Sequence, residues 1–592
     1  MKNMPNSALS PSSALIEQED IPMTHRQKRG LCWLIALLMT AAMMLFVLFC
    51  TDITFAANDD SSIMRAFMGY ETGKPARTHL FIHGLLAQPL GLLGEWFPGL
   101  PWFTYVQLAL LALSCTVIAK SIMQCFVKQN RSLLFGAAAA AVFLLVLCMR
   151  YVTFLTFTQT AAMLAAAACA QMLSIEHDRG AGHVIAGMSG ALALVCLGYA
   201  LRQNTLLPAV GFCGVIYAFS AWEYFGSGRS LRPMLLSLAV IAAVLAGMTG
   251  VRQLELSRPE MKEYLSWQEA NTELMDYTEI RTLPQEAFDA VGWDENSLAM
   301  AERWCFLDPA ISTEAFRTLT EYLYANNDAS AAEKLNAAWK LFAQTASENP
   351  LDMRCLAVGL LAALLCLLGA CAGRRRRLAL LVLAMTALTA AMTAYLALDG
   401  RLPLRALLVA ALPFAAFSFA ALPAALPERG KLLPAACCVL IAAMGLWCLW
   451  DTVPALLIDE EEKWTTGNAL TDLEEYAAYE PESLFLYDMS LTATDTRAFP
   501  PFPDGIPHNV SFWGGWPLRS PQSVEQFAAF DIDLMNFEPR DLLRDNVFVA
   551  SAAIDPPPVV LLNWLQTEVS PNIECELYAE YGYAYIFHFY EY

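Results

Sequence analysis

Long apolar runs without ionisable residues constrain this chain more than any other feature. Eleven runs of roughly 18 to 21 residues contain no Asp, Glu, Lys, Arg or His, and each can cross about 30 Å of hydrocarbon as a helix. They cover residues 31–50, 102–119, 132–149, 154–174, 184–201, 205–222, 233–250, 356–373, 378–398, 406–426 and 432–450. The sequence therefore predicts an α-helical polytopic membrane protein with about eleven transmembrane helices.

These runs divide the chain into two membrane parts and three polar parts. We expect a disordered cytoplasmic segment at 1–30, seven spans within 31–250 and four within 353–451. The stretch 251–352 has helical periodicity that prolines interrupt, which predicts a helical outer domain. The tail 452–592 has short runs rich in Tyr, Phe and Val between helical segments, which predicts a small α/β domain.

Lys and Arg are concentrated in alternate connections between the spans. Arg26, Lys28 and Arg29 precede the first span, and four consecutive arginines occupy positions 374–377. Short cytoplasmic connections are enriched in Lys and Arg. We therefore expect a plasma membrane protein with its N-terminus inside and its C-terminus outside.

The charge of the two long polar stretches bears on the partners of the protein. Acidic residues outnumber basic residues by 19 to 8 in 251–352 and by 24 to 5 in 452–592. Nucleic acids select clustered Lys and Arg, so the composition argues against a nucleic-acid partner.

Residues 79–97 form a further apolar stretch that follows the first span. As a span of its own it would reverse every later connection and place residues 374–377 outside, so we predict an interfacial or re-entrant helix. His79 and His83 would lie one helical turn apart on it, a spacing that can bind a metal. Since no third ligand is near in sequence, interfacial histidines are the simpler interpretation, and a divalent metal ion stays an open question.

Two adjacent acidic residues, Asp59 and Asp60, lie in the first outer loop, 51–101. Neighbouring carboxylates repel each other, which raises the pKa of at least one of them. A carboxylate of this kind suits a general base for a hydroxyl, or a metal ligand. The competing interpretation is an ordinary solvated loop or a helix N-cap.

Arginines occur where positively charged residues are unexpected, near the outer ends of spans. The set consists of Arg65 in the first outer loop and of Arg150, Arg202, Arg401 and Arg405. Guanidinium groups bind phosphate through paired hydrogen bonds, which predicts a site for a lipid-linked phosphate at this depth. The alternatives are anchoring to lipid headgroups and pairing with outer carboxylates.

The tail contains the segment Trp513-Gly514-Gly515-Trp516-Pro517, which predicts a tight turn that presents two indoles. Indoles on such a surface can stack on sugar rings. A turn buried in a core is the competing interpretation.

Together, these features resemble the GT-C superfamily of membrane glycosyltransferases, such as the protein O-mannosyltransferases and the aminoarabinose transferases. The shared layout is an acidic pair after the first span, an interfacial helix, many further spans and an outer C-terminal domain. The chain also resembles a group of bacterial, Firmicutes-like polytopic membrane proteins with a Trp-Gly-Gly-Trp-like segment in the tail. The motifs are short, although the layout covers nearly the whole chain.

The resemblance implies a function and a set of roles. The donor would be a polyprenyl-phosphate-linked sugar, and the acceptor an extracytoplasmic glycan, lipid or protein of the cell envelope, with membrane lipids around both. The catalytic base of the superfamily maps to Asp59 or Asp60, of which we favour Asp60 slightly. Many members have Asp-Glu at this position, so the Asp-Asp of this chain leaves the acting carboxylate open.

Three other functions compete with a transferase. A glycan polymerase or ligase shares the apolar layout, and a non-catalytic scaffold would use the outer domains to bind envelope polymers. An ion-coupled transporter is disfavoured, because such carriers place ionisable residues within their spans and these eleven runs have none.

Overall fold

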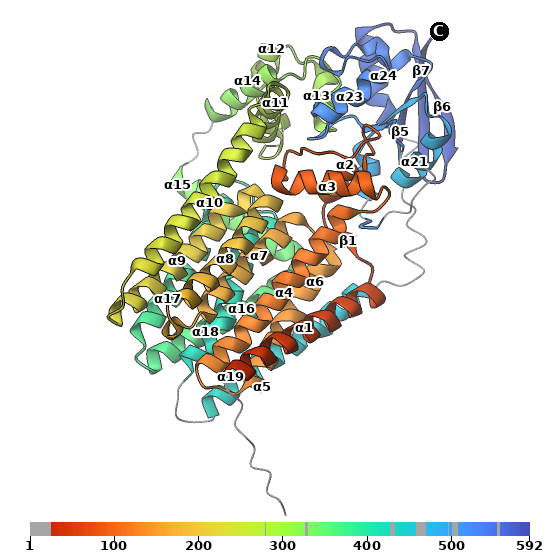
Figure 1. The fold of residues 1–592 in the computed structure, drawn as a ribbon. Coiled ribbons are helices and arrows are strands. Elements are labelled where there is room, and N and C mark those ends of the chain that lie inside the picture. The colour runs from red at the N-terminus through yellow and green to blue at the C-terminus, as the bar shows by residue number, and fades with distance from the viewer. Residues whose placement is uncertain are drawn as a thin grey trace, which may run out of the picture.

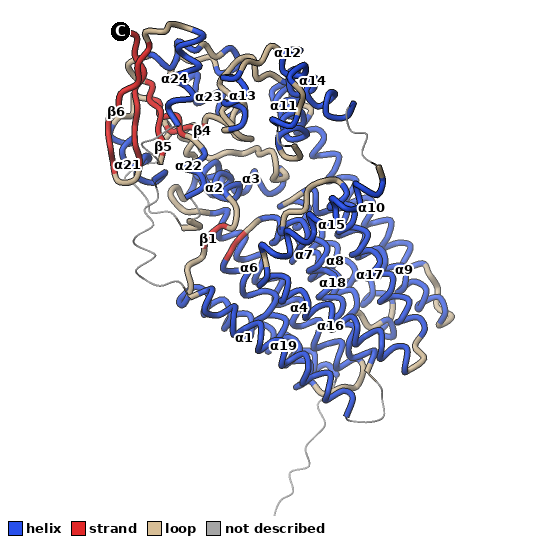
Figure 2. Tube along the Cα trace, turned by 180° about the vertical axis from the view of Figure 1, so that it is seen from behind, coloured by secondary structure: helices blue, strands red, loops and turns tan. Residues whose placement is uncertain are grey.

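The computed structural model describes residues 25–278, 280–325, 330–426, 432–457, 469–494, 497–499, 507–552 and 557–592. A bundle of long helices carries, at one end, a layer of shorter helices and a C-terminal sheet (Figures 1 and 2). Residues 1–24 of the predicted disordered segment 1–30 lie outside the described residues. Residues 25–30 are not disordered, because they form the first turns of α1.

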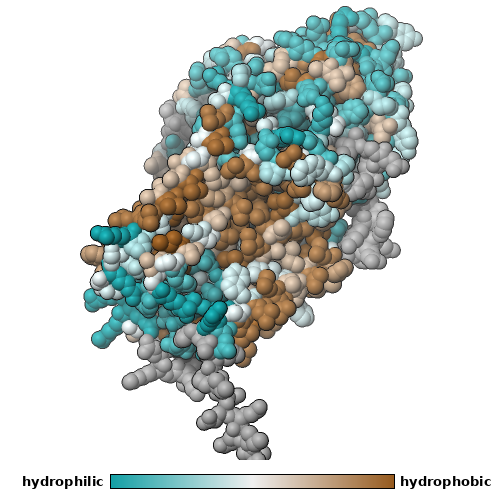
Figure 3. Space-filling view, in the orientation of Figure 1, coloured by the Kyte–Doolittle hydropathy of each residue, from teal (hydrophilic) through white to brown (hydrophobic). Residues whose placement is uncertain are grey.

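Ten helices in the described part of the chain are long and apolar enough to cross a membrane. Figure 3 shows an apolar band over the bundle with hydrophilic surface at both of its ends. The ten are α1 (His25–Cys50), α4 (Trp102–Lys128), the continuous helix α5–η1–α6 (Leu133–Phe143, Leu144–Cys148 and Met149–Thr153), α8 (Ala181–Leu201), α9 (Leu206–Gly226), α10 (Arg232–Leu256), α16 (Pro350–Ala372), α17 (Arg376–Leu398), α18 (Leu404–Ala425) and α19 (Leu432–Leu456).

The eleventh predicted span corresponds to α7 (Phe157–Ser174), which is less apolar than the ten. Nearly all of its side chains are buried, because α7 packs against α4, α8 and α18 in the middle of the bundle (Figure 1). Neighbouring helices rather than lipid surround α7. Polar residues such as Gln159 are therefore tolerated in it.

We call the layer of shorter helices and strands the outer layer, after the predicted topology. The opposite end of the bundle collects the basic residues that we assigned to the cytoplasm. Arg29, Lys128, Arg131 and Arg375 contact Glu176 or main-chain carbonyl oxygens there, near the short helix η2 (His177–Arg179). The alternating connections predicted from the sequence are therefore brought together at one end.

Cysteine labelling should place this basic end in the cytoplasm. A Cys50→Ser/Cys371→Ser background removes the two thiols that are exposed among the described cysteines. In this background we expect Asp178→Cys and Gly228→Cys to react only in permeabilised cells. Glu286→Cys, in the outer layer, should react in intact cells, because the positive-inside rule places that layer outside. Labelling of Glu286→Cys from the cytoplasmic side alone would contradict the topology.

The first outer loop forms α2 (Asn58–Met68) and α3 (Gly84–Trp96), which lie across the outer end of the bundle (Figure 1). With 13 residues, α3 is about 20 Å long, too short to cross a bilayer. A two-residue strand, β1 (Thr54–Phe55), pairs in parallel with β2 (Phe154–Leu155). This pairing fixes the start of α2 beside the start of α7.

The middle stretch and the tail build the outer layer. The middle stretch contains α11 (Pro259–Met275), η4 (Ile280–Thr282), α12 (Gln285–Val291), α13 (Glu295–Glu302), α14 (Thr313–Ala325) and α15 (Ala331–Glu348). The tail contains α21 (Ala469–Tyr479), β3 (Leu484–Tyr487), α22 (Met489–Thr494), β4 (Val510–Phe512), α23 (Pro521–Ala528), η5 (Leu534–Asn536), η6 (Pro539–Leu543), β5 (Val547–Ser551), α24 (Pro557–Glu568), β6 (Ile573–Tyr581) and β7 (Ala584–Glu591). The sheet order is β4-β3-β5-β7-β6, with β3 parallel to β4 and β5, and β7 antiparallel to β5 and β6.

The middle stretch does not form one independent unit. Trp267, Phe306 and Phe316 share an apolar core with Val549 and Trp564 of the tail. In contrast, α15 packs against α16 and α17 and belongs to the core of the bundle. The predicted domain 251–352 is thus divided, with α11–α14 joined to the tail and α15 to the membrane part.

Candidate functional site

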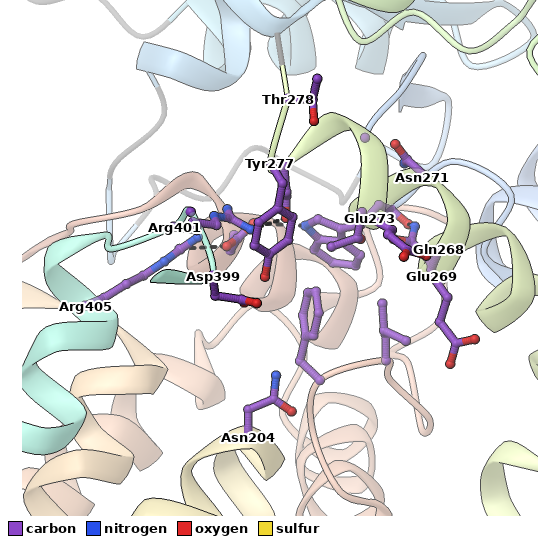
Figure 4. Close-up of a pocket in the computed structure, with 18 of the residues that line it drawn as sticks. Asn204, Gln268, Glu269, Asn271, Glu273, Tyr277, Thr278, Asp399, Arg401 and Arg405 are labelled. Carbon is purple, nitrogen blue, oxygen red and sulfur yellow. Dashed lines mark hydrogen bonds and ion pairs between the residues drawn. The ribbon is translucent and has the colours of Figure 1, made fainter. Parts of the chain in front are cut away.

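A cavity of about 1680 Å³ lies where the bundle meets the outer layer. It is lined by residues of α2, α11, α15 and the turn after β4, and by the connection between α17 and α18. Figure 4 shows Arg401 and Arg405 on one side of it and Gln268, Glu269 and Glu273 of α11 on the other. Four of the predicted functional residues line this cavity together with Asp59, namely Arg202, Arg401, Arg405 and Trp516.

Asp59 and Asp60 occupy the first turn of α2, but their environments differ completely. Asp60 is fully buried, and its Oδ1 accepts hydrogen bonds from the Phe157 main-chain N–H at 2.7 Å and from Gln107 Nε2 at 3.2 Å. Phe157 is the first residue of α7, so the Asp60 carboxyl lies at the positive end of that helix. Asp60 lines none of the described cavities and connects α2 to α7 and α4.

Burial raises the pKa of Asp60 to about 8, and the neighbouring charge of Asp59 adds to the rise. The hydrogen bonds from Phe157 and Gln107 favour the carboxylate and oppose this effect. The Asp60 carboxyl is therefore largely protonated at neutral pH. The raised pKa that the sequence predicts for one member of the pair falls on the member that does not face the cavity.

Asp59 lines the large cavity and is held by two side chains distant in sequence. Its Oδ2 accepts a hydrogen bond from Arg405 Nη1 at 2.8 Å, and its Oδ1 accepts one from Trp516 Nε1 at 3.1 Å. The first outer loop, the start of α18 and the tail thus meet at a single carboxylate. This position makes Asp59, rather than Asp60, the candidate base.

Arg202 differs from the other arginines of the cavity, because its guanidinium makes no hydrogen bond or ion pair with any described residue. It lies between the rings of Phe81 and Phe157, 4.8 Å from each ring centroid. Burial lowers the pKa of Arg202 to about 10, so the group remains a cation at neutral pH. A half-buried cation without a hydrogen-bonded carboxylate is a candidate site for an anion.

Arg401 and Arg405 each pair with a carboxylate. Arg401 forms an ion pair with Asp276 and lies over the ring of Tyr277, and Arg405 pairs with Asp59. Arg401 precedes α18, which begins at Leu404, so the two arginines do not share a helical face. They nevertheless line the same cavity as Arg202 (Figure 4).

Arg65 and Arg150 lie outside the large cavity. Arg65 is buried and forms an ion pair with Glu474 of α21, and it lines none of the described cavities. Arg65 therefore does not face the cavity in which we expected a phosphate, and its ion pair joins α2 to the tail. Arg150 Nε lies 2.9 Å from Asp352 Oδ1 and lines a second cavity of about 620 Å³.

The second cavity is separated from the first by residues that belong to both. Asn58 and Arg405 line each of the two cavities. Gln159 lines the second cavity, and its buried Oε1 has no hydrogen-bond partner among the described residues. Asp59 therefore lies close to the boundary between two spaces, each large enough for a ligand.

The two tryptophans of the tail motif have different environments. Trp516 lines the large cavity, whereas Trp513 is only 2% exposed and belongs to the core of the outer layer. The turn requires its glycines: a Cβ on Gly514 would lie 1.4 Å from the Trp304 carbonyl oxygen, and Gly515 has a φ of +61°. The core interpretation thus holds for Trp513, and the cavity receives Trp516 alone.

His79 and His83 do not lie on one helix, so the predicted helical metal spacing is wrong. His83 caps α3: its Nδ1 accepts from the Leu85 N–H, and its Nε2 lies 2.9 Å from the Met248 carbonyl oxygen. Burial, together with the charges of Arg252 and Arg202, lowers the pKa of His79 to about 3, so this ring is neutral. Within the described ranges, no three His, Cys, Asp or Glu side chains are grouped as metal ligands would be.

Three partners of the site were not singled out from the sequence. Gln107 gave a weak signal, since it is a polar residue within the apolar run 102–119. Asp276 and Glu474 gave none, because each is one of many acidic residues in the outer stretches. They can be recognised only from contacts between parts of the chain that are distant in sequence.

No family model, curated protein or solved structure matches this chain. The interpretation of the site therefore rests on its own geometry and chemistry.

Proposed function

We propose that this protein is an integral membrane glycosyltransferase that moves a sugar from a polyprenyl-phosphate donor to an extracytoplasmic acceptor. The proposal rests on one observation, the convergence of Asp59 and three guanidinium groups on a cavity at the boundary between bundle and outer layer. The first-loop position of Asp59 agrees with the GT-C resemblance.

The chemistry assigns a role to each group. Asp59 would accept the proton of an acceptor hydroxyl, whose oxygen attacks the anomeric carbon of the donor sugar. The bond between the anomeric carbon and the phosphate oxygen breaks, and polyprenyl phosphate leaves. Arg202 would bind the phosphate directly, and stabilising the negative charge of a leaving group in this way lowers the barrier. Arg401 and Arg405 add positive charge to the same wall.

The boundary position of Asn58 and Arg405 also suits a two-substrate reaction. A transferase must hold donor and acceptor on opposite sides of the reacting bond, and the two cavities meet beside Asp59. We therefore propose that donor and acceptor occupy different cavities. A glycan polymerase or ligase would use the same arrangement with a longer acceptor.

A non-catalytic scaffold that binds envelope polymers is the second candidate, and a specific observation favours it. Four of the five predicted anion-binding arginines already pair with carboxylates, namely Arg65, Arg150, Arg401 and Arg405. In that case the pairs of Arg65, Arg401 and Arg405 would hold the outer layer on the bundle, and the cavity would hold a polymer without reaction.

Substitution of Arg202 distinguishes these functions. In proteoliposomes with a radiolabelled polyprenyl-phosphate hexose, Arg202→Gln should weaken donor use by about tenfold or more, because a hydrogen-bonded charge is lost. Arg202→Lys should retain more donor use, since lysine keeps the positive charge but lacks the paired N–H donors of a guanidinium group. Arg281→Gln is the control, as Arg281 is exposed and pairs with Glu295 away from the cavity.

The measurement is the rate of sugar transfer over a range of donor concentrations. If the wild-type protein transfers sugar and all three variants show its dependence on donor concentration, Arg202 is not a phosphate ligand. Absence of transfer from any such donor, with intact binding of envelope polymer, would favour the scaffold.

A further inference from the structure

The helix α15 is amphipathic and presents an uncovered apolar face. Leu335, Trp339 and Phe342 follow one another at spacings of four and three residues and so share one side of the helix. Leu335 is 65% exposed and Trp339 is 68% exposed, whereas Phe342 is half-buried against the core of the bundle. The rings of Trp339 and Phe342 stack at 5.9 Å. Apolar side chains with this pattern normally pack against something.

A second side of α15 fixes its depth relative to the bundle. Ala338 and Thr345 are buried, and the Thr345 hydroxyl donates a hydrogen bond to the Leu402 carbonyl oxygen at 2.9 Å. The helix packs against α16 and α17, and only Asn349 separates it from the start of α16. In Figure 2, α15 lies at the level where the bundle meets the outer layer.

A third side of α15 faces the large cavity. Glu333, Lys334, Ala337 and Leu341 line the same space as Arg202. Glu333 and Ala337 lie about 160° around the helix from Leu335, because successive residues turn by about 100°. The wall between the cavity and the surroundings of Trp339 is therefore one helix thick.

The exposed apolar face continues the lipid-facing surface of the bundle. Tyr395, near the outer end of α17, is 67% exposed, and α17 is one of the helices that can cross a membrane. Tryptophan is enriched where a bilayer meets water, and amphipathic helices lie in that plane with the apolar side down. A lipid surface therefore fits this face by its chemistry and its position.

We propose that α15 lies in the headgroup region of the leaflet beneath the outer layer, with Leu335, Trp339 and Phe342 inserted among the upper acyl chains. The helix is then the lipid-side wall of the large cavity. A lipid with an anionic headgroup would enter the cavity past this helix, by moving sideways from the bilayer. The lipid contact itself does not depend on the proposed transferase function.

Fluorescence quenching in reconstituted protein tests this placement. The emission lost in Trp339→Phe relative to wild type isolates the signal of Trp339 among the tryptophans. That signal should be quenched more strongly by lipids brominated on the upper acyl carbons than by lipids brominated near the chain ends, and only weakly by aqueous iodide. Trp564→Phe is the control, because Trp564 is 1% exposed within the outer layer and its signal should respond to neither quencher.

A matched variant moves the reporter to the other side of the same helix. In the Trp339→Phe background, Gln344→Trp should be quenched by iodide and not by brominated lipid, since Gln344 is exposed roughly opposite to Leu335. Quenching of Trp339 by iodide alone would overturn the proposal by placing its face in water. Protection of Trp339 from both quenchers would also overturn it, because a protein partner or a second copy would then cover the face.

Discussion

Asp59→Asn should lower sugar transfer from a polyprenyl-phosphate donor by at least about 10²-fold, whereas Asp60→Asn should leave most of it. Asparagine keeps the shape of aspartate, but its single oxygen can accept from Arg405 or from Trp516, whereas Asp59 accepts from each through a different oxygen. Asparagine cannot accept a proton from the acceptor hydroxyl. The loss should therefore appear in turnover, with donor binding affected less.

The expected mildness of Asp60→Asn follows from the environment of Asp60. Because burial raises its pKa to about 8, the wild-type group is already mostly neutral at pH 7. The Asn side chain can still accept from the Phe157 N–H and the Gln107 amide. Purified variants assayed at saturating donor would decide the roles: wild-type turnover in Asp59→Asn, or equal losses in both variants, would contradict the assignment of Asp59 as base.

The same substitution at Asp60 has a consequence for stability. A carboxyl with a folded pKa near 8 and an unfolded pKa near 3.8 holds its proton in the folded state while the unfolded state releases it. Stability from this group therefore falls as pH rises from about 4 to about 8. The wild type should therefore lose stability between pH 5 and pH 8, and Asp60→Asn should not. Thermal unfolding in detergent should show that the Tm of the variant minus the Tm of the wild type increases over this range. A difference independent of pH would contradict the buried, protonated carboxyl.

Arg65→Met should destabilise the docking of the tail by about 3–5 kcal/mol, because it leaves the buried carboxylate of Glu474 without its partner. The double variant Arg65→Met/Glu474→Leu should recover part of this loss, since it removes both charges. Thermal unfolding and limited proteolysis of the tail measure the effect. Arg77→Met, which breaks the exposed pair with Glu95, is the matched control and should change little.

If Arg65 instead bound a substrate phosphate, Arg65→Met would impair donor use without altering Tm, and the double variant would show no recovery. That outcome would restore the role predicted from the sequence. The geometry argues against phosphate binding by Arg65, because its guanidinium already forms an ion pair with the carboxylate of Glu474 in α21.

Much of the architecture could be predicted because it depends on the amino-acid composition of each separate segment. A helix in lipid must be apolar along its whole length, so α1, α10 and α17 are recognisable from their runs alone. α7 tests the limit of this rule: it is surrounded by protein, and its run is correspondingly less apolar. The division of the middle stretch could not be predicted, because α11–α14 and α15 alike mix apolar and charged residues.

The candidate site shows the same division at the level of single residues. The acidic pair and most of the outer arginines were visible, since ionisable groups at a membrane boundary are rare enough to be informative. Asp59 and Asp60 were not distinguishable. Neighbouring residues on a helix point about 100° apart, so one can face a cavity while the other faces the core.

The sequence by itself determined that this chain crosses a membrane many times and which residues carry charge near its boundary, because lipid acts on each segment separately. Only the tertiary structure decided the roles of those charges: Asp59 meets Arg405 and Trp516, Asp60 lies at the start of α7, Arg65 pairs with Glu474, and Arg202 remains without a carboxylate. Each of these pairs joins segments far apart in the chain. The physical reason is that the energy of a charge depends on the groups around it, and packing brings those groups from elsewhere in the chain.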